Sequence, residues 1–200
     1  MESAMPPVFL ALHAHIHSAT TPGVPSVEDR IVAGLTEAQL RQCVDHHDSI
    51  VWLLWHIARV EDFMINTCVR GVEQVFDRGG WQARLGVSRR DIGTGMTAEQ
   101  VAQFSAQVDV AAVRAYRAAV AHETRTGLTA RDFDNLDKPV AGAGERAAAS
   151  GDLGSGAEYV PDMVRTRPRW FLLCSEGIGH SYEHLALAEH VARLLGRTGR

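Results

Sequence analysis

Residues 48–70, DSIVWLLWHIARVEDFMINTCVR, form the longest apolar-periodic stretch of the chain and decide its fold. Asp48 or Ser49 can cap the amino end of a helix here, and Gly71 can end it. Apolar side chains cover a wide arc of this helix, with Asp62 and Asn66 on the opposite side. The stretch therefore predicts a helix whose apolar arc lies in the protein core.

Further helices are predicted on both sides of this segment. Thr97 and Gln100 form a capping-box pattern that opens a helix over residues 97–123. A last helix is predicted over residues 170–195, and prolines break the amino-terminal region into helices over residues 8–19 and 27–34. No strand pattern competes with these helices.

Two connecting segments, residues 79–95 and 139–156, are predicted to be irregular. The second reads PVAGAGERAAASGDLGSG, and its Gly, Ala and Ser content favours a flexible insert. Long helices with one apolar face each must bury those faces against one another. The sequence thus predicts an all-α helical bundle, with residues 1–200 as a single domain.

Charge and cysteine content narrow the classes of protein to which the chain can belong. Its 20 Lys and Arg residues are outnumbered by 24 Asp and Glu, for a net charge of −4, which argues against a nucleic-acid partner. No run approaches the roughly 20 apolar residues of a membrane span, so no membrane association is expected. Three scattered cysteines and the lack of a secretory signal pattern favour the cytoplasm.

Ten histidines are the unusual feature of the composition. At about 100° per residue, His184 lies about 40° from His180, on the apolar stripe of the last helix. His190 falls off that stripe and is expected at the surface. His56 lies within the apolar arc of the helix over residues 48–70, so it also points inward.

Three inward imidazoles on two helices need polar partners. An unsatisfied buried polar group costs roughly 1–3 kcal/mol, whereas neutral imidazoles are good ligands for zinc. The i, i+4 spacing of His180 and His184 lets two side chains share one ion. A metal site of His56, His180 and His184 is therefore preferred over three separate hydrogen-bonded core histidines.

Other residues could support chemistry at such a site. Glu176 lies near the same stripe and could orient His180 or move a proton, although an ordinary helix-edge carboxylate fits equally well. Arg59 could hold a substrate carboxylate, with a surface salt bridge as the alternative. Cys68 and Cys174 are not expected to reach the ion.

A second group of histidines lies near the amino terminus. His13, His15 and His17 would align on one face of a strand, or His13 and His17 would pair on a helix. No strand pattern surrounds them, so exposed or partly packed side chains are expected rather than a metal site.

Three motifs together resemble the DinB-like superfamily, which includes the metal-binding domain of mycothiol-dependent maleylpyruvate isomerase. HDSIVWLLWHIARVED resembles the second helix of that family, and HSYEHLALAEHVARLLG resembles its last helix with the HxxxH segment. GWQARLGVSRRDIGTGMTAEQV is similar to the loop that leads into the third helix. The resemblance covers about residues 35–196 and departs from the family pattern in the proline-broken start and the Gly/Ala-rich insert.

The resemblance implies an up-down-down-up four-helix bundle in which His56, His180 and His184 hold a divalent ion, zinc or nickel. It also implies a homodimer and, for some members, a thiol-dependent transferase or isomerase reaction. Such an enzyme would take a small-molecule substrate and a low-molecular-weight thiol such as mycothiol or bacillithiol. The alternatives are a non-catalytic metal-binding or dimerising stress-response protein of the same fold, and a bundle without metal.

Overall fold

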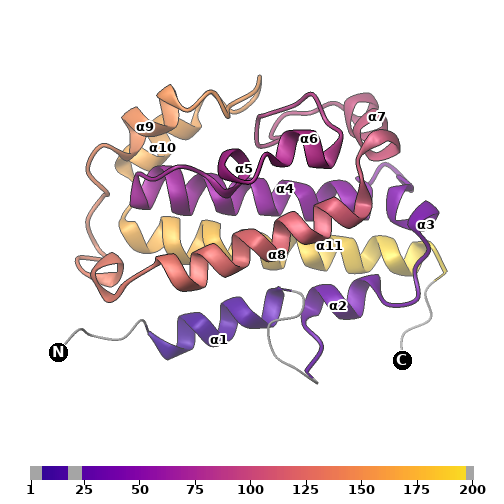
Figure 1. The fold of residues 1–200 in the computed structure, drawn as a ribbon, viewed down its shortest axis with the longest axis horizontal. Helices are drawn as coiled ribbons and strands as arrows, with labels where there is room; N and C mark the ends of the chain where they lie inside the picture. The colour runs from indigo at the N-terminus through magenta and orange to yellow at the C-terminus, as the bar shows by residue number, and fades with distance from the viewer. Residues whose placement is uncertain (1–5, 18–23, 197–200) are drawn as a thin grey trace.

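Four long helical segments lie side by side in the computed structural model, which describes residues 6–17 and 24–196 (Figure 1). No β-strand occurs within these two ranges. The long segments are α1 (Pro7–Ile16) with α2 (Val27–Val32), α4 (Ile50–Asp62) with the π-helix η1 (Phe63–Arg70), α8 (Val110–Gly127), and the π-helix η3 (Phe171–Gly179) with α11 (His180–Leu194).

The direction of the four segments can be followed in Figure 1. α1 and α2 run from left to right, α4 and α8 from right to left, and α11 from left to right again. This is the up-down-down-up order that the family resemblance implies. Shorter helices complete the fold: α3 (Glu37–Arg41), α5 (Val75–Arg78), α6 (Trp81–Leu85), α7 (Ala98–Gln107), the 3-10 helix η2 (Ala130–Phe133), α9 (Ala143–Ala149) and α10 (Val160–Thr166).

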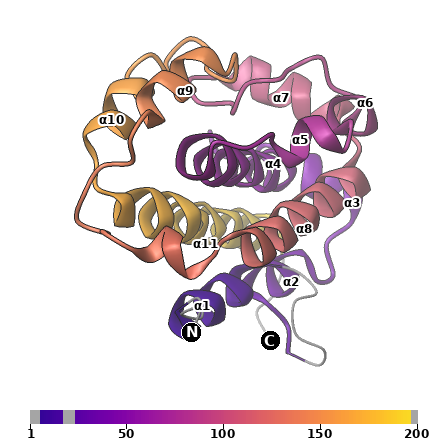
Figure 2. The same ribbon diagram turned by 60° about the vertical axis from the view of Figure 1, so that its left-hand side comes forward.

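α4 is the central helix of the molecule, and all of its residues are buried (Figure 2). Of the two predicted caps, Ser49 is the one used, because its side chain accepts a hydrogen bond from the Trp52 amide. Gly71 ends the continuing η1 in the left-handed conformation, with φ of 66°. Arg59, Glu61 and Asp62 lie on this buried helix, so the fold must supply partners for three charged groups.

The predicted helix over residues 97–123 is wrong in one respect, because it is two helices. Thr97 caps α7 with the expected capping box. The helix then ends at Gln107, and the Asp109 side chain accepts from the Ala112 amide at 2.8 Å to start α8. A second N-cap inside the predicted helix therefore turns the chain between α7 and α8.

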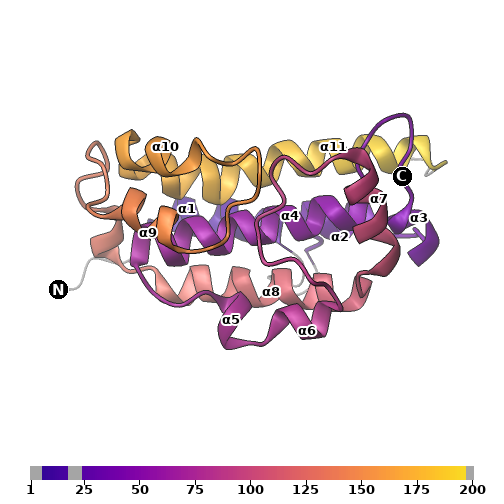
Figure 3. The same cartoon turned by 90° about the horizontal axis from the view of Figure 1, so that it is seen from above.

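The prediction of an irregular insert over residues 139–156 is wrong in part. Seven residues of this segment form α9, which packs on η1 and on α10 near the end of α4 (Figure 3). Arg146 of α9 donates to the Thr67 carbonyl at 2.8 Å, and Asp152 is completely buried. Likewise, α6 lies within residues 79–95, which were expected to be irregular.

Predictions for the ends of the chain are confirmed in outline. α1 and α2 are the two expected helical pieces, although residues 18 and 19 of the first prediction lie outside the described residues. The last segment runs without a break from η3 into α11, and Gly196 follows it with φ of 87°. Among the described helices, none combines the length and apolar character needed to cross a bilayer.

Candidate metal centre

His56 of α4 meets His180 and His184 of α11 in the interior of the bundle. The ring centroid of His56 lies 5.1 Å from that of His180 and 5.0 Å from that of His184. Each of the three residues offers one ligand nitrogen, and the three nitrogens lie within 4.8 Å of one another. The structure therefore brings together the three histidines that helical phase selected, in a group that could hold a metal ion.

His56 is fixed by its surroundings on two sides. Its Nδ1 lies 2.6 Å from the carbonyl oxygen of Ile92, so Nδ1 carries the proton and donates to that oxygen. The indole of Trp52 stacks on the imidazole, with centroids 4.8 Å apart and an interplanar angle of 8°. This arrangement leaves the Nε2 lone pair available to a ligand, and a carbonyl partner of this kind is common behind metal-binding histidines.

The loop that supplies Ile92 comes close to α4 because the next residue is glycine. Gly93 has φ of +86°, and a Cβ atom there would lie 2.5 Å from Cζ3 of Trp55 and 3.4 Å from Nδ1 of His56. Asp91 holds the turn by accepting from the Gly93 amide at 2.9 Å. A side chain at position 93 would thus displace the carbonyl that orients His56.

His180 and His184 face each other through their Nε2 atoms, which are 3.0 Å apart. Two neutral imidazoles can make this contact only if one Nε2 carries a proton, and a cation would take the place of that proton. The Nδ1 of His180 is buried and has no hydrogen-bond partner among the described residues. Both rings are only partly buried, in contrast to His56, so this side of the triad is the more open one.

All three imidazoles favour the neutral form that binds metal. Burial lowers the pKa of His56 to about 4 and that of His180 to about 2, and it also lowers the pKa of His184. The mutual proximity of the rings adds to the shift at His56 and His180. No proton has to be removed from a charged ring before a cation binds at neutral pH.

Glu176 does not orient His180 as expected, because the helix is π-helical at this point. The His180 amide donates to the carbonyl of Ser175, five residues earlier, so Ser175 and not Glu176 lies one turn before the ligand. Glu176 makes no hydrogen bond to a described residue. Its half-buried carboxyl has a raised pKa, first from burial and then from the charge of Glu183.

Arg59 is neither at the border of the site nor on the surface, so both expectations for it are wrong. Its guanidinium is completely buried, and Nη2 donates to Asp152 Oδ1 at 3.0 Å. Nη1 donates to Gln74 at 2.7 Å and to the hydroxyl of Tyr116 at 3.0 Å. The guanidinium is therefore buried against protein groups, and it is not accessible to a substrate.

The cysteines lie apart from the triad. The cluster contains neither Cys68 nor Cys174. Cys68 is buried, and burial raises the pKa of its thiol to about 12. Cys174 is exposed on η3. His190 is exposed on α11, as predicted.

A second cluster was missed at the sequence level. His13 and His17 are completely buried, contrary to expectation, and both approach the carboxylate of Glu61. Their i, i+4 spacing at the end of a short helix was a usable signal. The sequence holds no comparable signal for Glu61, because its neighbours on α4 do not reveal which face of that helix packs against α1.

Two comparisons with known proteins bear on these observations. A family model described as the DinB superfamily matches residues 26–154. This range includes His56 and ends before the helix that carries the other two histidines. A search of curated proteins finds no match to the chain.

Proposed function

The chain belongs to the DinB superfamily, and on that premise we propose that it binds a divalent first-row metal ion through His56, His180 and His184. Zinc is the first candidate and nickel the second. The observation that carries the proposal is the convergence of three ring nitrogens from α4 and α11 on one point.

The surroundings of the triad fit a cation. His56 uses Nδ1 for the Ile92 carbonyl, which directs Nε2 towards the other two rings. The short contact between Nε2 of His180 and Nε2 of His184 needs a positive charge or a proton between them. Nitrogen donors of this kind suit zinc and nickel better than calcium or magnesium.

We further propose that the protein is a thiol-dependent transferase or isomerase. Three neutral ligands would leave a bound ion its full charge and an open position, which lowers the pKa of a bound water or thiol. The partial exposure of His180 and His184 supports access from outside. Because no cysteine belongs to the cluster, the thiol would be an external low-molecular-weight compound, and the electrophile a small molecule.

Glu176 is the proposed proton carrier of this reaction. Burial and the charge of Glu183 raise the pKa of its carboxyl, so it holds a proton on Oε more readily than an ordinary glutamate. It lies on the segment that leads directly into His180. No described residue forms a hydrogen bond with this carboxyl, which leaves it available to act on a substrate.

A non-catalytic metal-binding protein is the second candidate, and the position of Arg59 favours it. The buried pair with Asp152 removes the expected anchor for a substrate carboxylate. The homodimer and the cytoplasmic location remain predictions under both candidates.

Metal binding is tested first, on protein produced without a His tag in zinc-supplemented medium. Elemental analysis is expected to find a zinc content that falls by one ion per chain on His184→Ala and is unchanged on His190→Ala, an exposed histidine of the same helix. Equal zinc content in the wild type and in His184→Ala would contradict the triad.

Catalysis is tested by incubating the zinc- or nickel-loaded protein with a small thiol and a panel of electrophiles. The transferase proposal predicts turnover that His184→Ala abolishes and that Glu176→Gln reduces without loss of bound metal. Stoichiometric metal without turnover on any thiol in the panel would favour the non-catalytic candidate.

A further inference from the structure

The second buried cluster joins the amino-terminal helix to the centre of the bundle. Nε2 of His13 lies 2.8 Å from Glu61 Oε1, and Nε2 of His17 lies 3.0 Å from Glu61 Oε2. The ring centroids of the two imidazoles are 4.3 Å apart, and all three side chains are completely buried. Each of the two oxygens of this carboxylate thus lies next to an imidazole nitrogen.

Several contacts hold these three groups in place. Thr124 of α8 donates its hydroxyl to Glu61 Oε1 at 2.7 Å. Arg117 of α8 donates to the Ile16 carbonyl at 3.1 Å, which fixes the end of α1 beside His17, and pairs with the buried Glu28. The cluster therefore lies where α1, α4 and α8 meet.

We propose that His13, His17 and Glu61 form a second divalent-cation site, which fastens α1 to α4. Two imidazole nitrogens and a carboxylate are a donor set that zinc accepts, and their ligand atoms lie within 4.8 Å of one another. Because all three residues are buried, this site has no open side for a substrate, and its role is structural.

The second site is separate from the triad although both use α4. Glu61 follows His56 by five residues, which is about 7.5 Å along the helix and about 140° around it. His56 faces α11, whereas Glu61 faces α1 and α8. Loss of one site should therefore leave the other intact.

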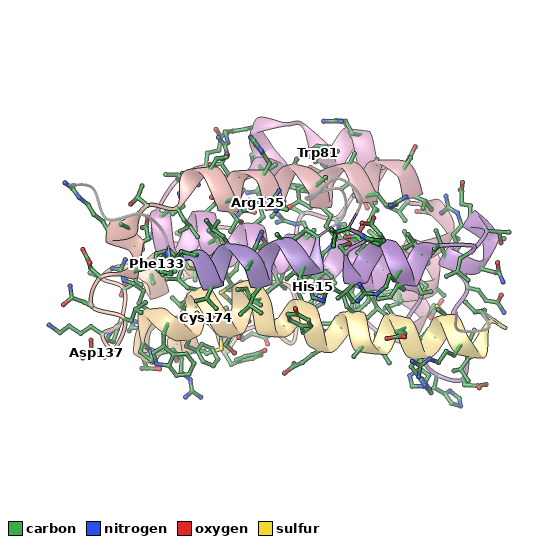
Figure 4. The ribbon with its side chains drawn as sticks, turned by 90° about the horizontal axis from the view of Figure 1, so that it is seen from below. His15, Trp81, Arg125, Phe133, Asp137 and Cys174 are labelled. Carbon is green, nitrogen blue, oxygen red and sulfur yellow. The ribbon has the colours of Figure 1, made fainter. Side chains whose placement is uncertain are left out.

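Arg125 of α8 is the competitor for this cation. In Figure 4, α1 lies between α8 and α11, with Arg125 on the α8 side and His15 on the α11 side. Nη1 of Arg125 points at Nδ1 of His13 from 3.4 Å, and its charge also acts on Glu61. A ligand His13 would need a proton on Nδ1, so Arg125 must withdraw when the cation binds. A substitution of Arg125 is therefore expected to change the affinity of the site for a cation.

The test uses the full chain with His184→Ala as background, so that only the second site is scored. Protein without a tag, produced with added zinc, is analysed for bound zinc after desalting. We expect about one zinc per chain in this background, with the same content after His15→Ala, an exposed histidine of α1. The ion should be lost on His13→Gln and on Glu61→Gln.

Arg125→Met separates a cation site from a hydrogen-bonded cluster. Removal of the competing charge should tighten zinc binding by about tenfold or more, because two positive charges a few ångströms apart repel by about 1 kcal/mol even in water and by more in a buried site. Weaker zinc binding in Arg125→Met would contradict the site.

X-ray absorption on the His184→Ala protein gives a second readout that leaves all three ligands in place, in case the ligand variants do not fold. Two imidazole nitrogens and carboxylate oxygen around zinc would support the site. Absence of zinc from His184→Ala, or zinc that survives His13→Gln, would overturn it. Neither outcome depends on the triad, because a failed triad would leave the wild type and His184→Ala with the same single ion.

Discussion

At the scale of single residues, the candidate site depends on groups that hold the ligands in position. His56 is directed by a backbone carbonyl on a loop 36 residues away in sequence, and that loop can approach only because Gly93 has no side chain. The orientation of His56 therefore depends on the glycine at position 93.

Gly93→Ala is expected to weaken metal binding by the triad. Its Cβ would meet Trp55 at 2.5 Å, and the positive φ adds backbone strain, for a combined cost of about 2–3 kcal/mol in the free energy of unfolding. Gly86→Ala is the matched control, since Gly86 has φ of +69° but nothing within 4 Å of the added atom. Urea unfolding and zinc titration of both variants measure the effect. Equal loss of zinc affinity in the two would contradict it.

The sequence predicts the three ligands but not the groups that hold them in position. His180 and His184 lie on α11, which has regular α-helical geometry, so the phase angle between them holds. The same count fails for Glu176, because π-helical hydrogen bonds in η3 shift the register before His180. The Ile92 carbonyl has no signature in the sequence, since every residue has such a group.

At the scale of elements, the segment over residues 139–156 shows why composition misled. Its small residues suggest a flexible linker, but Asp152 reaches Arg59, which lies 93 residues earlier. Gln74 also donates to Asp152 Oδ2, at 2.6 Å. Contacts over such distances in sequence leave no local pattern, so only the fold reveals that the segment is anchored.

Asp152→Asn is expected to lower the free energy of unfolding by about 3 kcal/mol. The change takes a charge from a buried pair and places an amide donor opposite Arg59 or Gln74, both of which already donate. Asp162→Asn, which removes an exposed pair with Arg165, should cost about 0.5 kcal/mol or less. Urea denaturation compares the two. Similar midpoints for both variants would show that Asp152 does not anchor the insert.

At the scale of the whole molecule, burial of neutral histidines makes stability depend on pH. The pKa values of His56, about 4, and of His180, about 2, lie below the ordinary value of 6.5. At a pH between the lowered pKa of each ring in the folded protein and 6.5, the unfolded chain binds protons that the folded chain does not. Stability is therefore fully present above pH 6.5 and falls as the pH drops towards 4.

The metal-free protein should accordingly unfold at lower urea concentration at pH 5.5 than at pH 7.5. Each proton taken up on unfolding contributes about 1.4 kcal/mol per pH unit, and His180→Gln should make the dependence shallower. Unchanged stability between the two pH values would mean that these rings are not buried in the neutral form.

Anomalous X-ray diffraction at the zinc edge would show whether three imidazoles from α4 and α11 share one ion. Crystals of zinc-loaded His13→Gln protein would show the triad without the second site. We expect one strong anomalous peak about 2.0–2.1 Å from a ring nitrogen of each of His56, His180 and His184. A map with no peak at that position, or with any of the three rings turned away from it, would show that the three histidines do not share an ion.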